Sequence, residues 1–338
     1  MKEQLHTERY SIFNADCVEI VEKLDDNNID LVIYSPPFGG LFSYSSDPRD
    51  FSNVDNPEQF LQQYDYLIKE LARITKSGRI NAVHCMDICD NYGKLWDFPH
   101  EIIELHKKNG FDYCSRITIW KEPLKVRMRT MVQSLMHKFI VEDSTKCFPA
   151  IPDYILIFKK RGEVENPVTH ITGMNYYAGE VPILPHMVRA WNNQNKTDFN
   201  EEQLWEYLKK EKSKDNEKIT KLNHYIWQRY ASAVWDDIRN DNVLPYRDSK
   251  EEDDEKHIHP LQLDVIERLV ELYSNPNEII LTPFMGVGSE IYGAVKKGRK
   301  GIGIELKSSY FKQATINLNN IIYDEEENSQ ISLLTENK

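Results

Sequence analysis

The chain has 338 residues, of which 40% are hydrophobic, and a formal net charge of −12. Its length exceeds the usual range of one domain, which predicts one large core with an inserted segment or a second small domain. The acidic balance argues against a protein that binds nucleic acid over its whole surface. No apolar run is long enough to span a membrane. The polar N-terminus shows no signal peptide, and the five cysteines are scattered, so we expect reduced thiols in a cytosol.

The first predicted strand covers residues 10–16 and ends in Asp16, and a helix over 18–24 follows it. A carboxylate at this place either caps the helix or faces a ligand at the end of the strand. The residues alone leave both interpretations open.

A second strand over 29–34 runs into a rigid corner formed by Ser35, Pro36, Pro37 and Phe38. Two consecutive prolines cannot continue the strand, and they hold Ser35 in an extended conformation. Open α/β sheets bind their ligands at the carboxyl ends of such strands. The serine oxygen, the free backbone carbonyls and the nearby aromatic ring suit a flat group that carries an NH₂. An ordinary turn from strand to loop is the alternative.

Helices over 57–75 and 98–108 and strands over 79–84, 111–120 and 151–160 come next. Strands that alternate with helices predict an α/β fold with a mostly parallel sheet covered on both faces.

The most basic stretch of the chain follows the strand over 111–120. It contains one acid, Glu122, and five cations, which are Lys121, Lys125, Arg127, Arg129 and Lys138. Its position beyond a strand end, on the side where ligands bind, favours contact with phosphates. A solvated basic surface is the alternative.

From residue 161 to residue 256 the alternation of strands and helices is lost. A charged helix is predicted around 201–212, and most of the tryptophans in this segment are expected in a small local core: Trp191, Trp205, Trp227 and Trp235.

The cofactor-type turn lies near the end of the chain. A strand over 278–282 leads into a turn with Gly286 and Gly288, and Ser289 is predicted to cap the following helix. The next strand, 300–305, ends in Glu305, where a carboxylate holds the hydroxyls of a nucleotide ribose. A generic βαβ unit is the alternative, and the plain dinucleotide fingerprint is not met because the third glycine is missing.

Together, the Ser-Pro-Pro-Phe corner and the later Phe284-x-Gly286-x-Gly288 motif resemble the β class of DNA amino-methyltransferases. These enzymes transfer a methyl group from S-adenosylmethionine to the exocyclic nitrogen of cytosine or adenine. The catalytic motif precedes the cofactor motif, so the resemblance implies a circularly permuted, Rossmann-like methyltransferase sheet. It also implies a division into a catalytic half (1–160), a target-recognition region (161–256), a cofactor-binding half (257–323) and an acidic tail (324–338).

The resemblance also implies roles for individual residues. The catalytic residues are Ser35, Pro36, Pro37 and Phe38. The residues implied to bind the cofactor are Asp16, His259, Gln262, Thr282, Pro283, Phe284, Gly286, Gly288, Ser289 and Glu305. His259 and Gln262 belong to a His-Pro-x-Gln motif, and Asp16 would contact the adenine amino group. Thr282 departs from the family, which has an acid at this position. We expect no metal, since His257 and His259 have no further ligand at zinc spacing.

Ser35 at the first motif position favours cytosine N4 over adenine N6, the alternative target. The base would have to leave the duplex, because its amino group cannot be attacked while stacked. The expected partners are double-stranded DNA, a second copy of the chain and a cognate restriction endonuclease, in the cytoplasm of a prokaryotic or phage-infected cell. A silent DNA-binding subunit and a methyltransferase acting on RNA are the other interpretations.

Overall fold

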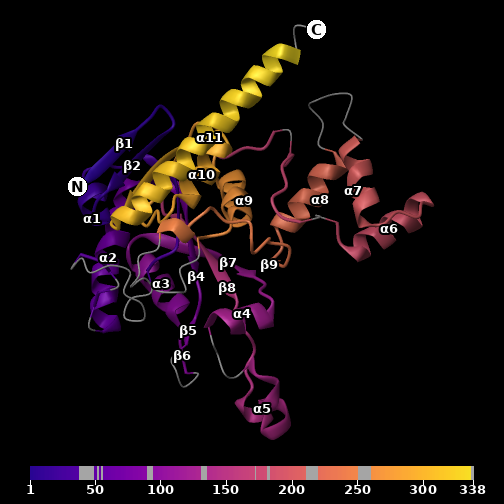
Figure 1. Cartoon of the computed structure of the whole chain (residues 1–338), viewed down its shortest axis with the longest axis horizontal. Coiled ribbons are helices and arrows are strands. Elements are labelled where there is room, and N and C mark those ends of the chain that lie inside the picture. The colour runs from indigo at the N-terminus through magenta and orange to yellow at the C-terminus, as the bar shows by residue number, and fades with distance from the viewer. Residues whose placement is uncertain are drawn as a thin grey trace.

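A computed structural model describes residues 1–37, 49–51, 53–54, 56–89, 94–130, 135–171, 173–180, 183–210, 220–249 and 260–335. In these ranges a nine-stranded mixed sheet forms the centre of the molecule, with the strand order β1–β2–β11–β10–β3–β4–β8–β7–β9 (Figure 1). The strands are β1 (Glu3–His6), β2 (Tyr10–Asn14), β3 (Ile29–Tyr34), β4 (Thr75–Cys85), β7 (Phe111–Ile119), β8 (Asp153–Lys160), β9 (Val234–Trp235), β10 (Ile279–Thr282) and β11 (Lys300–Glu305). A small hairpin joins β5 (Ile88–Cys89) to β6 (Leu95–Trp96).

The five strands from β2 to β4 in the sheet are mutually parallel. β8 lies antiparallel between β4 and β7, and β1 lies antiparallel to β2. The order confirms the permuted α/β prediction, because β10 and β11 come last in the chain but pack beside β3 inside the sheet.

Helices cover both faces of the sheet. The first face packs against α1 (Cys17–Val21), α2 (Pro57–Ile74) and α3 (Phe98–Lys108), and the second against α9 (Leu263–Tyr273) and α10 (Ser289–Lys296). β3 contributes Val32 to the first core and Leu31 and Ile33 to the second, and all three side chains are fully buried. Burial on both faces explains why residues 29–34 are apolar with almost no alternation.

Three further groups of helices extend from this body. α4 (Pro123–Thr130) and α5 (His137–Glu142) project from the end of the sheet that carries β7, and we call this projection, residues 121–148, the basic arm (Figure 1). α6 (Pro185–Asn195), α7 (Glu201–Lys210) and α8 (Lys221–Tyr230) form a separate cluster with a small core around Trp191. α11 (Ser308–Thr335) closes the fold.

Three local expectations differ from the structure. β4 begins at Thr75 rather than residue 79, because Gly78 adopts a φ of 72° and lets the strand continue through an irregular segment. β9 belongs to the segment expected to lack strands, yet it pairs with β7 and buries Trp235 in the main core. α11 continues through residues 324–335 of the predicted acidic tail, since no glycine or proline interrupts it.

Candidate functional site

The site is organised around two neighbouring strands, β3 and β10. They pair in parallel, with Leu31 opposite Ile280. The chain leaves β10 toward β11 on one side and leaves β3 toward β4 on the other. Such a reversal of direction opens a crevice beyond the carboxyl ends of the strands, where α/β proteins bind ligands. The Ser35 corner and the glycine turn after β10 therefore lie at the same edge of the sheet.

Phe284 connects the two motifs. Its ring lies 5.9 Å from that of Tyr34, the last residue of β3, and 5.6 Å from that of Phe51. These contacts are within the range of favourable aromatic pairs. Pro36 and Pro283, which begin the two turns, are buried. The packing thus fixes the glycine turn relative to the Ser35 corner.

Ser35 begins a hydrogen-bonded chain of polar side chains that the sequence analysis missed. Its Oγ lies 2.7 Å from His84 Nδ1, and His84 Nε2 lies 2.9 Å from Asp153 Oδ2. Lys121 Nζ lies 2.5 Å from the same carboxylate oxygen. These residues lie on or just beyond β3, β4, β8 and β7, which are consecutive in the sheet. The only sequence signal was a histidine near the end of an otherwise apolar strand.

Asp153 is the charged centre of this chain. Burial alone would raise the pKa of its carboxyl group, but the neighbouring His84 and Lys121 lower that pKa to about 2. The group is therefore ionised at neutral pH and can only accept hydrogen bonds.

The glycine turn closes onto Glu305. The backbone N–H of Gly286 donates to Oε2 at 2.8 Å, and that of Lys307 donates to Oε1 at 2.8 Å. Burial raises the pKa of Glu305 to about 7, against the effect of these two bonds. Gly286 has a φ of 55°, and a Cβ built on it would meet no atom within 4 Å. The described part of the turn therefore leaves its backbone open to a ligand.

Several polar groups beside this turn have no partner among the described residues. They are Gln262 Oε1, Thr282 Oγ1 and Ser289 Oγ, all in buried side chains. Because buried polar groups are normally hydrogen-bonded, these atoms fit a site that is completed by a polar ligand. Glu290 was also missed by the sequence analysis, and burial raises its pKa to about 8.

Two predicted capping roles have different outcomes. Asp16 caps α1, since its Oδ1 accepts a 2.7 Å bond from the Val18 N–H. The prediction that Ser289 caps α10 is wrong. Gly288 takes the cap position with a φ of 94°, so Ser289 falls inside the first turn of the helix.

The predicted DNA-binding residues fall into two places. Lys125 and Lys138 are exposed on the basic arm. Lys121 instead turns inward onto Asp153, which differs from the expected contact with phosphate. Arg127 and Arg129 lie on α4, but their side chains are outside the described part of the structure, as are residues Phe38 and His259.

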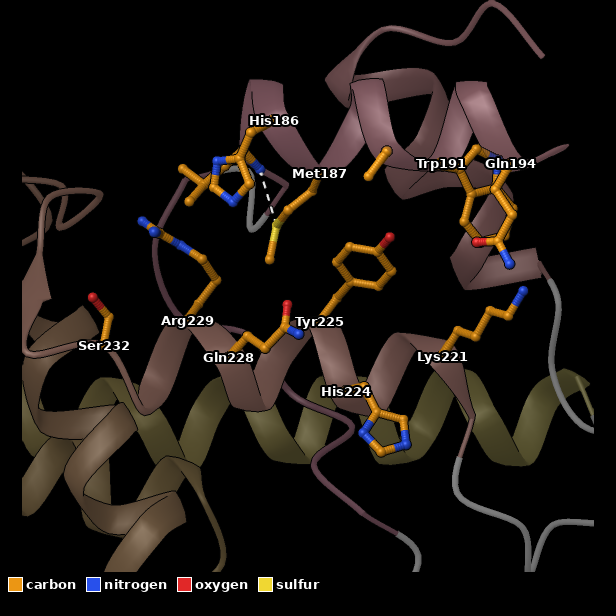
Figure 2. Close-up of a pocket in the computed structure, with 12 residues that line it drawn as sticks. His186, Met187, Trp191, Gln194, Lys221, His224, Tyr225, Gln228, Arg229 and Ser232 are labelled. Atoms are coloured by element: carbon orange, nitrogen blue, oxygen red, sulfur yellow. Dashed lines mark hydrogen bonds between the residues drawn. The ribbon is translucent and has the colours of Figure 1, made fainter. Parts of the chain in front are cut away.

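A second concave feature lies between α6 and α8, with a volume of 580 Å³. Figure 2 shows Tyr225 and Lys221 of α8 pointing toward α6, and Met187 and Trp191 pointing back. Gln194 and Gln228 also line this groove. The Trp191 side chain is buried, and its Nε1 lacks a hydrogen-bond partner among the residues described. We call this feature the α6–α8 groove.

Two negative findings hold for the parts of the chain given at the start of the fold description. No cluster of three or more His, Cys, Asp or Glu side chains is arranged for a metal ion. No helix is both long and apolar enough to cross a bilayer.

Comparisons with known proteins agree with this arrangement. The sequence model of a family described as DNA methylase matches residues 29–316. The type II methyltransferase M1.MboII of Moraxella bovis is 23% identical over 323 residues, which cover 92% of this chain and 96% of that protein.

Two solved structures share the fold. The DNA modification methylase TTHA0409 of Thermus thermophilus, described in its title as putative and in complex with S-adenosyl-L-methionine, superposes with a TM-score of 0.56 at 19% identity and covers 92% of this chain and 95% of its own. The cytosine-N4-specific PvuII DNA methyltransferase superposes with a TM-score of 0.57 at 14% identity, covering 92% and 86%.

Proposed function

Since the chain belongs to the DNA methylase family, we propose that it transfers the methyl group of S-adenosylmethionine to the exocyclic amino group of a base in double-stranded DNA, with cytosine N4 as the target. The observation that carries this proposal is the meeting of the Ser35 corner and the glycine turn at the β3–β10 edge. One motif offers acceptors for an amino group, and the other offers an open backbone to a cofactor.

The residues around the turn fit the cofactor. Glu305 keeps lone pairs for the ribose hydroxyls beyond its two backbone bonds, and Asp16 lies at the end of β2, beside β11. The unpaired oxygens of Gln262, Thr282 and Ser289 would bind polar groups of the cofactor. S-adenosylmethionine supplies an electrophilic methyl group when bound there. Thr282 carries no charge, so an acid elsewhere must pair with the methionine ammonium.

Ser35 acts on the nucleophile. The lone pair of an exocyclic amino group is delocalised into the ring, which makes the nitrogen a poor nucleophile. Ser35 Oγ and the Pro36 carbonyl accept its two hydrogens, favour a tetrahedral nitrogen and stabilise the charge that develops on it. The base must leave the stack to reach this edge, and its alignment with the methyl group supplies much of the rate.

Cytosine N4 is favoured by the serine at the first position of the catalytic motif. Adenine N6 is the second candidate, because the same acceptors would bind the adenine amino group. The basic arm would contact the DNA backbone through Lys125 and Lys138, with Arg127 and Arg129 on the same helix and segment. A homodimer, a cognate restriction endonuclease and a prokaryotic cytoplasm belong to the same proposal.

A transfer assay with methyl-labelled cofactor tests the proposal. The unchanged protein should label unmethylated duplex DNA in preference to unpaired RNA. Ser35→Ala should lower the rate roughly 100- to 1,000-fold, as loss of a group that stabilises developing charge does in other enzymes. Its cofactor affinity should stay unchanged. Equal labelling by both proteins would contradict the role of Ser35, and no labelling by either would favour a silent DNA-binding subunit.

A further inference from the structure

The chain Ser35–His84–Asp153–Lys121 joins the proposed catalytic corner to the interior of the protein. We propose that it is a proton relay, in which Ser35 passes the proton lost by the target amino group to His84, and Asp153 holds His84 ready to receive it. His84 acts through Ser35 and is therefore a positioning residue. The inference rests on the proposed function and deepens it, since it names the destination of the proton.

The hydrogen bonds determine which nitrogen of His84 carries the proton. Asp153 Oδ2 can only accept, so the N–H of a neutral imidazole must be on Nε2, which lies 2.9 Å from it. Nδ1 is then an acceptor and faces Ser35 Oγ at 2.7 Å. The serine hydroxyl consequently donates to His84, and its lone pairs are left for the amino group of a substrate.

The position of the relay is set by strand register. Tyr34 pairs with Val83, which places Ser35 beside His84 as β3 and β4 end. Ile119 at the end of β7 pairs with Asp153 at the start of β8, and Lys121 follows two residues later. His84 and Asp153 are well shielded, with side-chain exposures of 17% and 4%. Little water competes for the proton at this end of the sheet.

The atoms and charges balance. A bond forms between the amino nitrogen and the methyl carbon, and the bond from that carbon to the sulfonium sulfur breaks, leaving a neutral thioether. The positive charge now on nitrogen is relieved when its proton passes to Ser35 Oγ as the Oγ proton passes to His84 Nδ1. The products are a neutral methylated base, a neutral serine and an imidazolium paired with Asp153. The imidazolium then returns its proton to solvent.

Other ionisable groups near the relay differ from His84 in behaviour or position. Asp153 and Lys121 face it directly, and Cys85 is its neighbour in β4. Burial raises the pKa of the Cys85 thiol well above its usual value, so the thiol stays neutral. Asp87, Asp97 and Arg116 surround Cys85 on its other sides. Loss of rate at acidic pH, where a neutral imidazole is lost, should therefore follow His84.

The test compares the single-turnover rate of methyl transfer across pH for the unchanged protein and for His84→Asn. The Asn side chain keeps a hydrogen-bond acceptor where Nδ1 stood but cannot take up a proton at these pH values. We expect a rate loss on the order of 100-fold, disappearance of the acidic limb of the pH profile, and unchanged cofactor affinity. His100→Asn, on the exposed surface of α3, is the matched control and should change neither rate nor profile.

The outcomes separate the two proposals. Transfer by the unchanged protein together with a near-normal rate or an intact acidic limb in His84→Asn overturns the relay alone. No transfer by the unchanged protein, with cofactor bound, overturns the proposed function and the relay together.

A second variant and a spectroscopic measurement guard against a folding defect in His84→Asn. Asp153→Asn would present an N–H to His84 Nε2 and force the proton onto Nδ1, so the rate should fall by a similar factor. Nitrogen NMR of the unchanged protein should find the His84 proton on Nε2 at neutral pH. A proton on Nδ1, or a normal rate in Asp153→Asn, would overturn the relay.

Discussion

Glu305 combines a structural and a ligand-binding role within one side chain. Its two oxygens accept backbone bonds from Gly286 and Lys307, which shape the turn, and each oxygen keeps a second lone pair. Because burial raises the pKa of this carboxyl group to about 7, a substantial fraction is protonated at neutral pH. Ribose hydroxyls donate more strongly to an ionised carboxylate than to a protonated one.

The affinity for S-adenosylmethionine should therefore depend on pH. The folded pKa is raised, so the ionised form that binds is present above about pH 7 and is lost as the pH falls through that value. With one linked proton, the dissociation constant should rise about tenfold per pH unit below this point. Calorimetric titration of the cofactor across this range measures the effect.

Glu290 provides the control for this titration, since its pKa is raised to about 8 and it is mostly protonated at pH 7. Glu290→Gln should keep the pH dependence, whereas Glu305→Gln should remove it and weaken binding roughly 10- to 100-fold. Removal of the pH dependence by Glu290→Gln alone would show that Glu290 is the titrating group.

At the scale of elements, α6 and α8 carry the α6–α8 groove, whose polar rim includes Gln194 and Gln228. Glutamine side chains recognise adenine through paired hydrogen bonds in the major groove of DNA. The cation of Lys221 lies 4.5 Å from the ring centre of Trp191 and adds positive charge at the mouth of the groove. These features support the prediction that the segment 161–256 recognises the target sequence.

Replacement of Gln228 by alanine should relax sequence specificity. We expect about a tenfold to hundredfold loss of discrimination at one base pair, because one paired contact is lost, with little change in cofactor affinity. Sequencing of methylated positions across a genomic substrate measures this. Asn193→Ala, exposed on α6 but outside the groove, is the control. Identical site preferences for Gln228→Ala and the unchanged protein would place recognition elsewhere.

At the scale of the whole molecule, the sequence predicted what local signals encode. Apolar residues 29–34 predicted β3, the cap and proline at Asn56 and Pro57 predicted the start of α2, and the glycine motif predicted the turn after β10. The order of the two motifs predicted the permuted sheet. All of these depend on residues close together in the chain.

The contacts that the sequence did not reveal depend on register between distant strands. His84 meets Ser35 and Asp153 only because β8 runs antiparallel between β4 and β7, and no local pattern gives that direction. The same pairing turns Lys121 inward, although its neighbours in sequence suggested a surface cation. Ser289 was misplaced by one residue because Gly288 has a conformation that favours glycine at the cap.

The most direct measurement is the identity of the methylated nucleoside. Unmethylated genomic DNA, treated with the protein and methyl-labelled S-adenosylmethionine, would be digested to nucleosides and analysed by mass. We predict labelled N4-methylcytosine, because Ser35 begins the catalytic motif. Labelled N6-methyladenine would keep the reaction and correct the base. Absence of any labelled nucleoside, while the cofactor binds, would contradict methyl transfer to DNA by this protein.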